Sequence, residues 1–299
     1  MRHTKLAREM PLHLMILPAL ILLFVFAYVP MFGIVMGFEK YVPAKGILGS
    51  KWIWFGNYIY LYNLPDTFKV LFNTVYIASM KIIAGLIVPV MFALLLNEVR
   101  KQFIKRAAQT IIYLPYFLSW IILSGILLDI LSPSQGIVNH LLTAFGIKPI
   151  FFLGNEKWFP YIIVISDVWK NFGFNTIIYL AALTSIDPTY YEAAVIDGAG
   201  RWKQTLYVTL PGIMPIVVLM TTLSLGNVLN AGFDQIFNLY SPVVYSTGDI
   251  IDTMIYRLGM KEAQFGVATA AGFFKSVVSF IFVTVSYKLA DKYAGYRVF

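Results

Sequence analysis

Long runs of apolar residues, separated by short polar segments, dominate the sequence. A helix needs about 20 apolar residues to cross the roughly 30 Å hydrocarbon core of a membrane, and six segments reach that length. The pattern therefore predicts an all-α membrane protein of about six transmembrane helices, with five or seven as open alternatives. The predicted spans cover residues 12–37, 70–96, 108–131, 160–183, 212–233 and 267–289.

The predicted organisation is a short polar arm over residues 1–11, followed by a single transmembrane domain over residues 12–299. The first apolar run is longer than the roughly 7–15 residues of a signal-peptide core, and no small-x-small cleavage site follows it. We therefore expect the first helix to remain in the protein as an anchor.

Composition and charge support a membrane location. Only 13% of the residues are charged, against about 25% in a typical soluble domain. If the N-terminus is cytoplasmic, the inner segments (1–11, 97–107, 184–211 and 290–299) hold 11 Lys and Arg in 60 residues, whereas the outer segments hold 8 in 93. This asymmetry predicts that both termini and the 184–211 loop face the cytoplasm. The net charge of +8 then indicates contact with membrane lipid rather than nucleic acid.

The residues needed for several kinds of chemistry are missing from the sequence. It contains no cysteine, its three histidines are scattered, and it has no G-x-x-x-x-G-K-[ST] phosphate loop. We therefore expect no disulfide, no metal site and no catalytic residues. If the protein uses ATP, we expect a separate subunit to bind ATP and Mg²⁺, with no cofactor in this chain.

A polar segment between two apolar spans, residues 192–211, reads EAAVIDGAGRWKQTLYVTLP. Asp187 can cap a helix that has Pro188 at its favoured first position, and this helix should stop near Gly198. A second short helix can start after Gly200 and should end before Pro211, because proline disrupts a helix interior. The sequence thus predicts a compact helical knob.

The acidic residues of this segment, Glu192 and Asp197, bear on what the knob contacts. An amphipathic helix that lies on lipid usually carries a basic polar face, and carboxylates are poorly suited to anionic headgroups. An acidic residue on a short exposed helix fits basic groups of a soluble protein better. We therefore favour a protein docking surface over a lipid-facing one.

Four charged residues fall within or beside the predicted spans: Lys81, Asp167, Lys170 and Lys275. Charges in a membrane are costly, so each is a functional hypothesis by default. Asp167 and Lys170 lie three residues apart and can pair on one helix face, and a structural pair is favoured over a proton relay. The long side chains of Lys81 and Lys275 can reach the interface or a partner subunit.

Neutral polar residues form two further clusters, each on one helical face. Asn171, Phe174 and Asn175 lie on the fourth span, and Ser224, Asn227 and Asn230 or Ala231 lie on the fifth. Amides both donate to and accept from hydroxyl groups, and aromatic faces cover apolar C–H groups, so these clusters suit a sugar. The alternative is that they bond neighbouring helices together. The sequence leaves both interpretations open.

The knob also carries a familiar motif. Glu192-Ala193-Ala194, followed by Asp197-Gly198-Ala199 and closed by Leu210-Pro211, resembles the cytoplasmic loop of type I ABC importer permeases. Other segments resemble permeases for oligosaccharides and polysaccharide fragments. These segments are 28–33, 55–58, 72–74, 240–245, 252–257 and 266–272.

The resemblance implies a multi-pass permease of the bacterial cytoplasmic membrane that forms half of a translocation path. It implies a second homologous permease, two cytoplasmic ATPases and an extracytoplasmic solute-binding protein as partners. The 192–211 loop would be the coupling helix, with Glu192 facing basic groups of an ATPase, Ala193 and Ala194 allowing close approach, and Gly198 setting the bend.

The resemblance also implies that the solute is an oligosaccharide or polysaccharide fragment. Ser224 matches a sugar-contacting position of maltose-type relatives in kind, whereas Asn171, Phe174 and Asn227 stand at equivalent places with different side chains. The alternatives are a permease for amino acids, peptides or anions in the same class, and an ion-coupled secondary carrier.

Overall fold

The computed structural model describes residues 2–294, so the predicted inner residue Arg297 lies outside the described chain. The chain forms two compact units. The first contains the residues up to Pro65 together with Ile255–Phe274, and the second contains Asp66–Met254 together with the residues from Lys275 onward. Helices α15 (Ile251–Tyr256) and α16 (Phe265–Ala294) contribute residues to both units.

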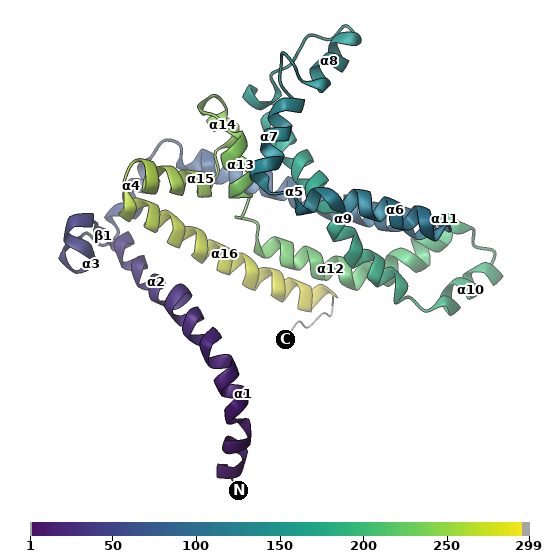
Figure 1. Cartoon of the computed structure of the whole chain (residues 1–299), viewed down its shortest axis with the longest axis horizontal. Coiled ribbons are helices and arrows are strands. Elements are labelled where there is room, and N and C mark those ends of the chain that lie inside the picture. The colour runs from purple at the N-terminus through teal and green to yellow at the C-terminus, as the bar shows by residue number, and fades with distance from the viewer. Residues whose placement is uncertain (1, 295–299) are drawn as a thin grey trace. The chain divides into compact units, whose positions relative to one another are not determined.

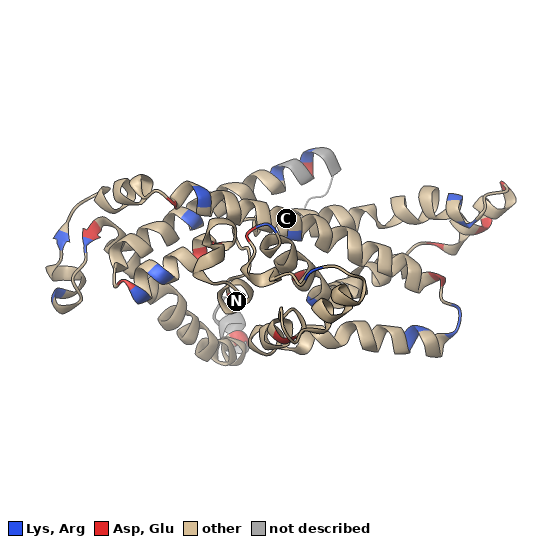
Figure 2. Ribbon diagram, turned by 90° about the horizontal axis from the view of Figure 1, so that it is seen from above, with Lys and Arg blue, Asp and Glu red and all other residues tan. Residues whose placement is uncertain are grey.

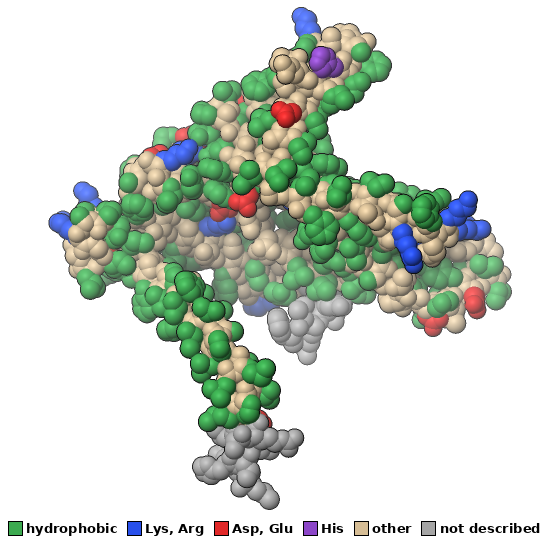
Figure 3. Space-filling view, viewed as in Figure 1, with side chains coloured by type: hydrophobic (Ala, Val, Ile, Leu, Met, Phe, Trp, Pro, Cys, Tyr) green, Lys and Arg blue, Asp and Glu red, His purple; other side chains and the backbone are tan. Residues whose placement is uncertain are grey.

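The first unit begins with a long helical rod. It consists of α1 (Arg2–Leu23), the π-helical η1 (Phe24–Tyr28), α2 (Val29–Met31) and the 3₁₀-helical η2 (Phe32–Phe38). The amide of Val29 bonds to the carbonyl of Phe24, a wider turn that comes just before Pro30. From Met10 onward the rod exposes many large apolar side chains, which Figure 3 shows along the face in view, as expected for a helix that contacts lipid or another subunit.

After the rod, the chain of the first unit forms a two-stranded sheet that the Asn57 side chain supports. Strands β1 (Glu39–Lys40) and β2 (Lys51–Trp52) pair antiparallel, with Glu39 opposite Trp52. The Asn57 amide donates to the carbonyls of Gly37 at 2.9 Å and Glu39 at 2.8 Å. A Cβ added at Gly266 would lie 2.8 Å from the Glu39 carbonyl oxygen, so only glycine fits there. The remaining elements are η3 (Pro43–Lys45), α3 (Gly46–Gly49), α4 (Gly56–Asn63) and η8 (Arg257–Lys261).

The second unit is built on two long helices that pack against each other, α5 (Thr67–Glu98) and α9 (Phe159–Thr184). One apolar core contains Ile77, Phe159 and Ile236, and another contains Tyr179 and Ile213. The other elements of this unit, whose α-helices are labelled in Figure 1, are α6 (Gln102–Tyr113), η4 (Leu114–Phe117), α7 (Trp120–Ile130), α8 (Ile137–Ala144), η5 (Phe152–Gly154), α10 (Pro188–Ile196), α11 (Arg201–Gln204), η6 (Thr205–Thr209), α12 (Leu210–Gly226), α13 (Phe233–Leu239), η7 (Pro242–Val244) and α14 (Tyr245–Gly248).

Three of the six predicted spans, 12–37, 70–96 and 267–289, coincide with long apolar helices of the structure. Within residues 2–294, four helices are long and apolar enough to cross a membrane, and a sharply bent pair makes a fifth candidate. The four are Glu9–Phe38, Thr67–Glu98, Arg201–Gly226 and Phe265–Lys288. The span predicted at 160–183 is the helix α9, which has the length but not the apolar composition. Polar residues in the middle of α9 account for this, and two of them, Asp167 and Lys170, have partners within the protein.

The span predicted at 108–131 is not one straight helix. The segments Gln102–Phe117 and Trp120–Ile130 meet at an angle of 102°. Pro115 cannot donate a helical hydrogen bond, and the break leaves carbonyl groups without amide partners. The Lys170 ammonium donates to two of them, 2.7 Å from the Tyr116 oxygen and 2.5 Å from the Leu118 oxygen. Lys170 therefore stabilises the bend from the neighbouring helix.

The span predicted at 212–233 is shifted toward the N-terminus. Its helix continues without a stop from Arg201 through Pro211, which contradicts the expected end before that proline. The π-helical turn η6 bonds the Leu210 amide to the Thr205 carbonyl, and Pro211 follows directly after this wider turn. The helix ends at Gly226, and the chain turns at Gly232, whose φ is +94°.

Candidate functional site

From here on the name knob refers to residues 187–204, which contain α10 and α11. Local contacts fold this segment. The Asp187 carboxylate accepts from the Thr189 amide at 2.9 Å and so caps α10, as predicted. This hydrogen bond from the backbone holds the pKa of Asp187 below its usual value. At the other end Gly198 has a φ of +73°, and the Ala199 amide bonds to the Ala194 carbonyl at 2.8 Å. This pattern is a Schellman cap, which confirms the expected bend.

A few side chains attach the knob to the rest of the second unit. Arg201 forms an ion pair with Glu98 at the end of α5, and the Tyr191 hydroxyl lies 3.0 Å from that of Thr209. Within the knob, the Gln204 amide donates to the Ala199 carbonyl at 2.8 Å. α10 and α11 lie at one end of the unit (Figure 1), where acidic and basic residues gather (Figure 2).

The outer face of the knob is both acidic and apolar. Glu192, Ala193 and Asp197 are exposed, whereas Ala194 and Ala199 are half-buried. Beside the acids, Ile196 is 86% exposed and Trp202 is 78% exposed. Large apolar side chains that stand in water next to charges mark a surface that another molecule covers.

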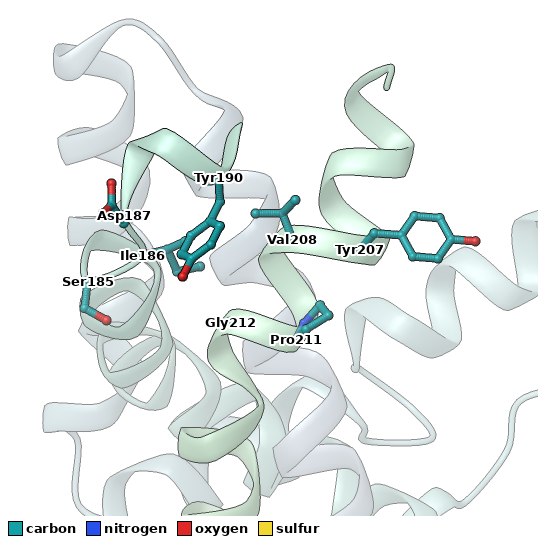
Figure 4. Close-up of a pocket in the computed structure, with 8 residues that line it drawn as sticks. All are labelled: Ser185, Ile186, Asp187, Tyr190, Tyr207, Val208, Pro211 and Gly212. Carbon is teal, nitrogen blue, oxygen red and sulfur yellow. The ribbon is translucent and has the colours of Figure 1, made fainter. Parts of the chain in front are cut away.

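A cavity of about 490 Å³ lies at the base of the knob. Tyr190 points toward Ile186 and Tyr207 points away from it (Figure 4). A Cβ at Gly212 would lie 2.7 Å from the Ile186 Cδ1 atom, so this glycine lets α12 pass close to Ile186. The lining residues are Ser185, Ile186, Asp187, Tyr190, Tyr207, Val208, Pro211 and Gly212.

A second cavity, of about 180 Å³, lies among α5, α9 and α12. It brings together Asn171, Asn175 and Ser224 from the two polar clusters found in the sequence. Asp167, Asn171 and Asn175 follow at four-residue intervals, so they share one face of α9. We call it the polar cavity; its lining residues are Lys81, Ile82, Gly85, Asp167, Val168, Asn171, Phe172, Asn175 and Ser224.

An ion pair lies at the wall of the polar cavity. The Lys81 ammonium lies 3.3 Å from Asp167 Oδ1, donates to the Ala231 carbonyl at 2.7 Å and also contacts Gln235 Oε1. Asp167 thus pairs with Lys81 and not, as predicted, with Lys170, because Lys170 bonds to the carbonyls of the bend. Sequence reasoning missed the fully buried Gln235, and no local signal marks it.

Three of the predicted sugar-path residues lie elsewhere. Phe174 stacks on Tyr116, with ring centroids 4.2 Å apart. Asn227 follows the last residue of α12 and bonds back to the Leu223 carbonyl at 3.2 Å, and Asn230 is exposed beyond the helix. The expected helical face of Ser224, Asn227 and Asn230 is therefore wrong, since the helix stops at Gly226.

Lys275 also has a partner within the chain. Its ammonium lies 2.5 Å from Asp252 Oδ1, so it neither extends to the interface nor waits for another subunit, as the sequence had suggested. Within the described residues, no group of three or more His, Cys, Asp and Glu is placed to hold a metal ion.

The geometry therefore combines an exposed acidic knob at one end of a helical membrane unit with a small polar cavity inside it. Residues 67–294, which include both features, match the family described as binding-protein-dependent transport system inner membrane component. The chain belongs to this family. It is a transport subunit of the inner membrane that crosses the bilayer several times, and it is not an enzyme.

Similar proteins cover nearly the whole chain. The polygalacturonan/rhamnogalacturonan transport system permease protein YteP of Bacillus subtilis (strain 168) is 41% identical, over 97% of this chain and 90% of its own. Protein LplB of the same organism is 37% identical, over 96% and 91%. A chain in the crystal structure of a bacterial ABC transporter involved in the import of the acidic polysaccharide alginate is 37% identical with a TM-score of 0.90, over 97% and 98%.

A second crystal structure shows a related chain in a larger assembly. It is the bacterial alginate ABC transporter in complex with alginate pentasaccharide-bound periplasmic protein. The matching chain is 36% identical with a TM-score of 0.89, over 97% of this chain and 96% of that one. The fold described here is therefore that of an ABC importer permease.

Proposed function

We propose that this chain forms half of the translocation path of an ATP-driven importer for an oligosaccharide or polysaccharide fragment. The exposed knob is the observation that carries the proposal. This chain has no phosphate loop of its own, so ATP-driven import would take its energy from a separate subunit that docks on an exposed surface such as the knob. The names of the relatives, which refer to polygalacturonan and alginate, support a saccharide as the solute.

In this proposal the knob seats in a groove of a cytoplasmic ATPase. Glu192 faces basic groups there, the small side chains of Ala193, Ala194 and Ala199 allow close approach, and Ile196 and Trp202 are buried by the contact. Asp197, Gly198 and Pro211 set the shape of the segment. Both termini and the knob face the cytoplasm, a second homologous permease completes the path, and a binding protein delivers the solute from outside.

The sugar path in this proposal runs past the polar cavity. Asn171, Asn175 and Ser224 offer amide and hydroxyl groups there, which bond to sugar hydroxyls in both directions. Phe174, Asn227 and Asn230 would contact the sugar elsewhere along the path, since they do not line the cavity. ATP and Mg²⁺ bind only to the ATPase partners.

The test is Glu192→Ala in the purified importer. We expect the variant permease to insert normally but to lose the ATPase subunits or to uncouple ATP hydrolysis from uptake, because Glu192 lies on the exposed face of the knob and outside the cores. Co-purification of the subunits and ATP-driven uptake are measured together.

The matched control is Glu156→Ala, which removes another exposed glutamate from a loop far along the chain from the knob. It should leave both measurements unchanged. If Glu192→Ala keeps its ATPase subunits and transports at the wild-type rate, the coupling role of Glu192 is wrong.

A further inference from the structure

An uncharged, largely aromatic surface lies in the segment that joins the first two candidate spans. Residues 52–63 contain no charged residue, and within α4 the buried residues are Asn57 and Leu61. Exposed apolar surface of this kind marks a site that another molecule or a membrane covers. We call the large exposed side chains of this stretch the aromatic patch; they are Trp52, Trp54, Phe55, Ile59, Tyr60 and Tyr62.

The patch is packed around the residue that ends the first span. This candidate span runs over Glu9–Phe38. The Ile53 amide donates to the Phe38 carbonyl at 2.9 Å, and the Phe38 ring stacks on that of Trp52, with centroids 6.0 Å apart. The Phe55 ring lies edge-on to Phe38 at 5.9 Å, and Figure 1 shows β1 and α4 at this end of the rod. Because a span ends where hydrocarbon gives way to headgroups, the patch lies at the level of the membrane interface.

The side chains of the patch have the chemistry of that interface. Tryptophan and tyrosine combine an apolar ring with an N–H or O–H group, and they are enriched where hydrocarbon meets water. The second candidate span begins at Thr67, so the segment between the two spans is tied to the bilayer at both ends. The interface is therefore the nearest surface that can cover the patch.

Two lysines of the same segment lie on the other face of its sheet. Lys40 and Lys51 are directly opposite each other in the β1–β2 pair, and side chains alternate between faces along a strand, so this pair and Trp52 point to opposite faces. Like charges placed in this way are destabilising, and among the described residues neither lysine forms an ion pair. Glu39, the acid of the sheet, is buried on the face of Trp52. Lipid phosphate groups would offset the repulsion, because the long side chain of lysine can extend its charge to the headgroups.

Trp54 is held in an unfavourable backbone conformation. Its φ of +54° lies in the left-handed region, which is costly for a residue with a Cβ and rare for a bulky one. Its ring contacts that of Trp52 edge-on, with centroids 5.7 Å apart, yet the residue remains 67% exposed. Contacts within the described chain therefore offset little of this cost. Such strain clusters at functional positions, and insertion of the indole into the interface would supply the missing stabilisation.

We propose that residues 39–63 form an interfacial anchor, in which the aromatic patch is immersed in the outer membrane interface and Lys40 and Lys51 contact lipid phosphate groups. The partner of this surface is lipid and not the solute-binding protein. The inference rests on the proposed function only for its topology, which makes the leaflet the outer one. An anchor packed around Phe38 fixes the depth of the first span.

The experiment measures the depth of the patch in the complete importer, reconstituted with cysteine-free partner subunits in vesicles of phosphatidylethanolamine and phosphatidylglycerol. The chain has no native cysteine, so Ile59→Cys can carry a single nitroxide label in the patch. The depth of the label follows from its collisions with oxygen, which dissolves in the membrane, and with a water-soluble nickel complex. Glu156→Cys, at an exposed loop residue outside the predicted spans, is the matched control.

We expect the label at Ile59 to lie about 5–10 Å into the boundary between headgroups and acyl chains, the depth typical of interfacial surfaces, and the label at Glu156 to lie in water. Trp54→Asn should shift the Ile59 label toward water. This variant should keep its fold, which thermal unfolding in mild detergent checks, because asparagine tolerates the left-handed conformation. Trp54→Tyr should retain the depth, since tyrosine also prefers the interface. Lys40→Gln combined with Lys51→Gln should cause a smaller shift, since the rings remain.

Three results would overturn the anchor. The first is equal exposure of the labels at Ile59 and Glu156 to the nickel complex. The second is a label at Ile59 that is shielded only after the solute-binding protein is added, because a protein then covers the patch. The third is an unchanged depth in a folded Trp54→Asn variant.

Failure of the proposed function gives different results. Ala44→Cys places a label on the exposed turn between the two strands. If ascorbate added outside right-side-out vesicles does not reduce this label, the proposed topology is wrong and the assignment to the outer leaflet falls with it. If the depth at Ile59 is as expected but the wild-type importer takes up no saccharide, the proposed function is wrong and the anchor stands.

Discussion

The knob and the polar cavity satisfy their polar groups in opposite ways. In the knob, the Asp187 cap and the Gly198 bend close the segment on itself, and large side chains such as Ile196 and Trp202 are left in solvent. In the cavity, Lys81 and Gln235 use their polar groups on partners brought together from α5, α9, α13 and the segment before α13.

The difference indicates which region another molecule completes. Burial of apolar surface is favourable in proportion to its area, so the exposed side chains of the knob gain most from a protein partner. The cavity gains little from one, because its ion pair is already satisfied. The other polar groups that line the polar cavity are the exposed side of Asp167, the amides of Asn171 and Asn175 and the Ser224 hydroxyl.

The largest expected effect is that of Lys81→Met, which tests whether the Lys81 contacts stabilise the wall of the polar cavity. If the cavity wall is held by its own contacts, removing the cation leaves Asp167 and two buried acceptors without a partner. Losing one member of a buried pair costs on the order of 3–5 kcal/mol. We expect a loss of that size in the free energy of unfolding, measured by titrating the purified chain in mild detergent with a denaturing detergent.

Lys275→Met serves as the matched control. Its ammonium also pairs with an aspartate, Asp252, but within the described residues it has only this one acceptor, whereas the Lys81 ammonium has three. The control should therefore lose clearly less stability than Lys81→Met. An equal or smaller loss for Lys81→Met would show that the network around the cavity is not what holds its wall together.

The two regions also differ in how far the sequence predicted them. The cap at Asp187 and the bend at Gly198 were predicted correctly because their determinants lie within a dozen residues of one another. Lys81 is 86 positions from Asp167 and 154 from Gln235. Nothing local in the sequence reveals such a pairing, although each charge by itself was a marked candidate.

Two of the wrong predictions, the Asp167–Lys170 pair and the helix end before Pro211, have a common physical cause. Asp167 and Lys170 have the spacing of a helical pair, but the carbonyls freed by the bend at Pro115 compete for Lys170. Pro211 does stop an ordinary helix interior, yet the π turn before it removes the conflict. In both cases irregular backbone changed the outcome, and a hydrophobic pattern does not show where such turns form.

A second prediction tests the knob, with a smaller expected effect. Gly198 has a φ of +73° and open space around its Cα, so Gly198→Ala adds backbone strain without a steric clash. The left-handed conformation costs a residue with a Cβ about 1–2 kcal/mol. We expect amide hydrogen exchange in α10 to become about fivefold faster or more, since this is the factor for roughly 1 kcal/mol.

Gly200→Ala is the matched control for that measurement. Gly200 also has open space around it, but its φ of −69° is ordinary for any residue. Alanine there should leave exchange unchanged or make it slightly slower, because the unfolded chain loses freedom. Equal acceleration in both variants would mean that the bend does not hold the knob in shape.

The smallest expected effect concerns the pH dependence of the cap. The amide of Thr189 lowers the pKa of Asp187 in the folded protein below the ordinary value of 3.8. A carboxyl group with a lowered folded pKa contributes stability above its unfolded pKa and loses that contribution as the pH falls through the folded value. The protection factor of the Thr189 amide should therefore be constant from pH 6 to pH 8 and fall only in acid, below about pH 4.

In Asp187→Asn, which cannot titrate, the acid-dependent fall should be absent. If the protection factor falls equally in both proteins, another group causes the fall, and the Asp187 carboxylate does not stabilise the start of the knob.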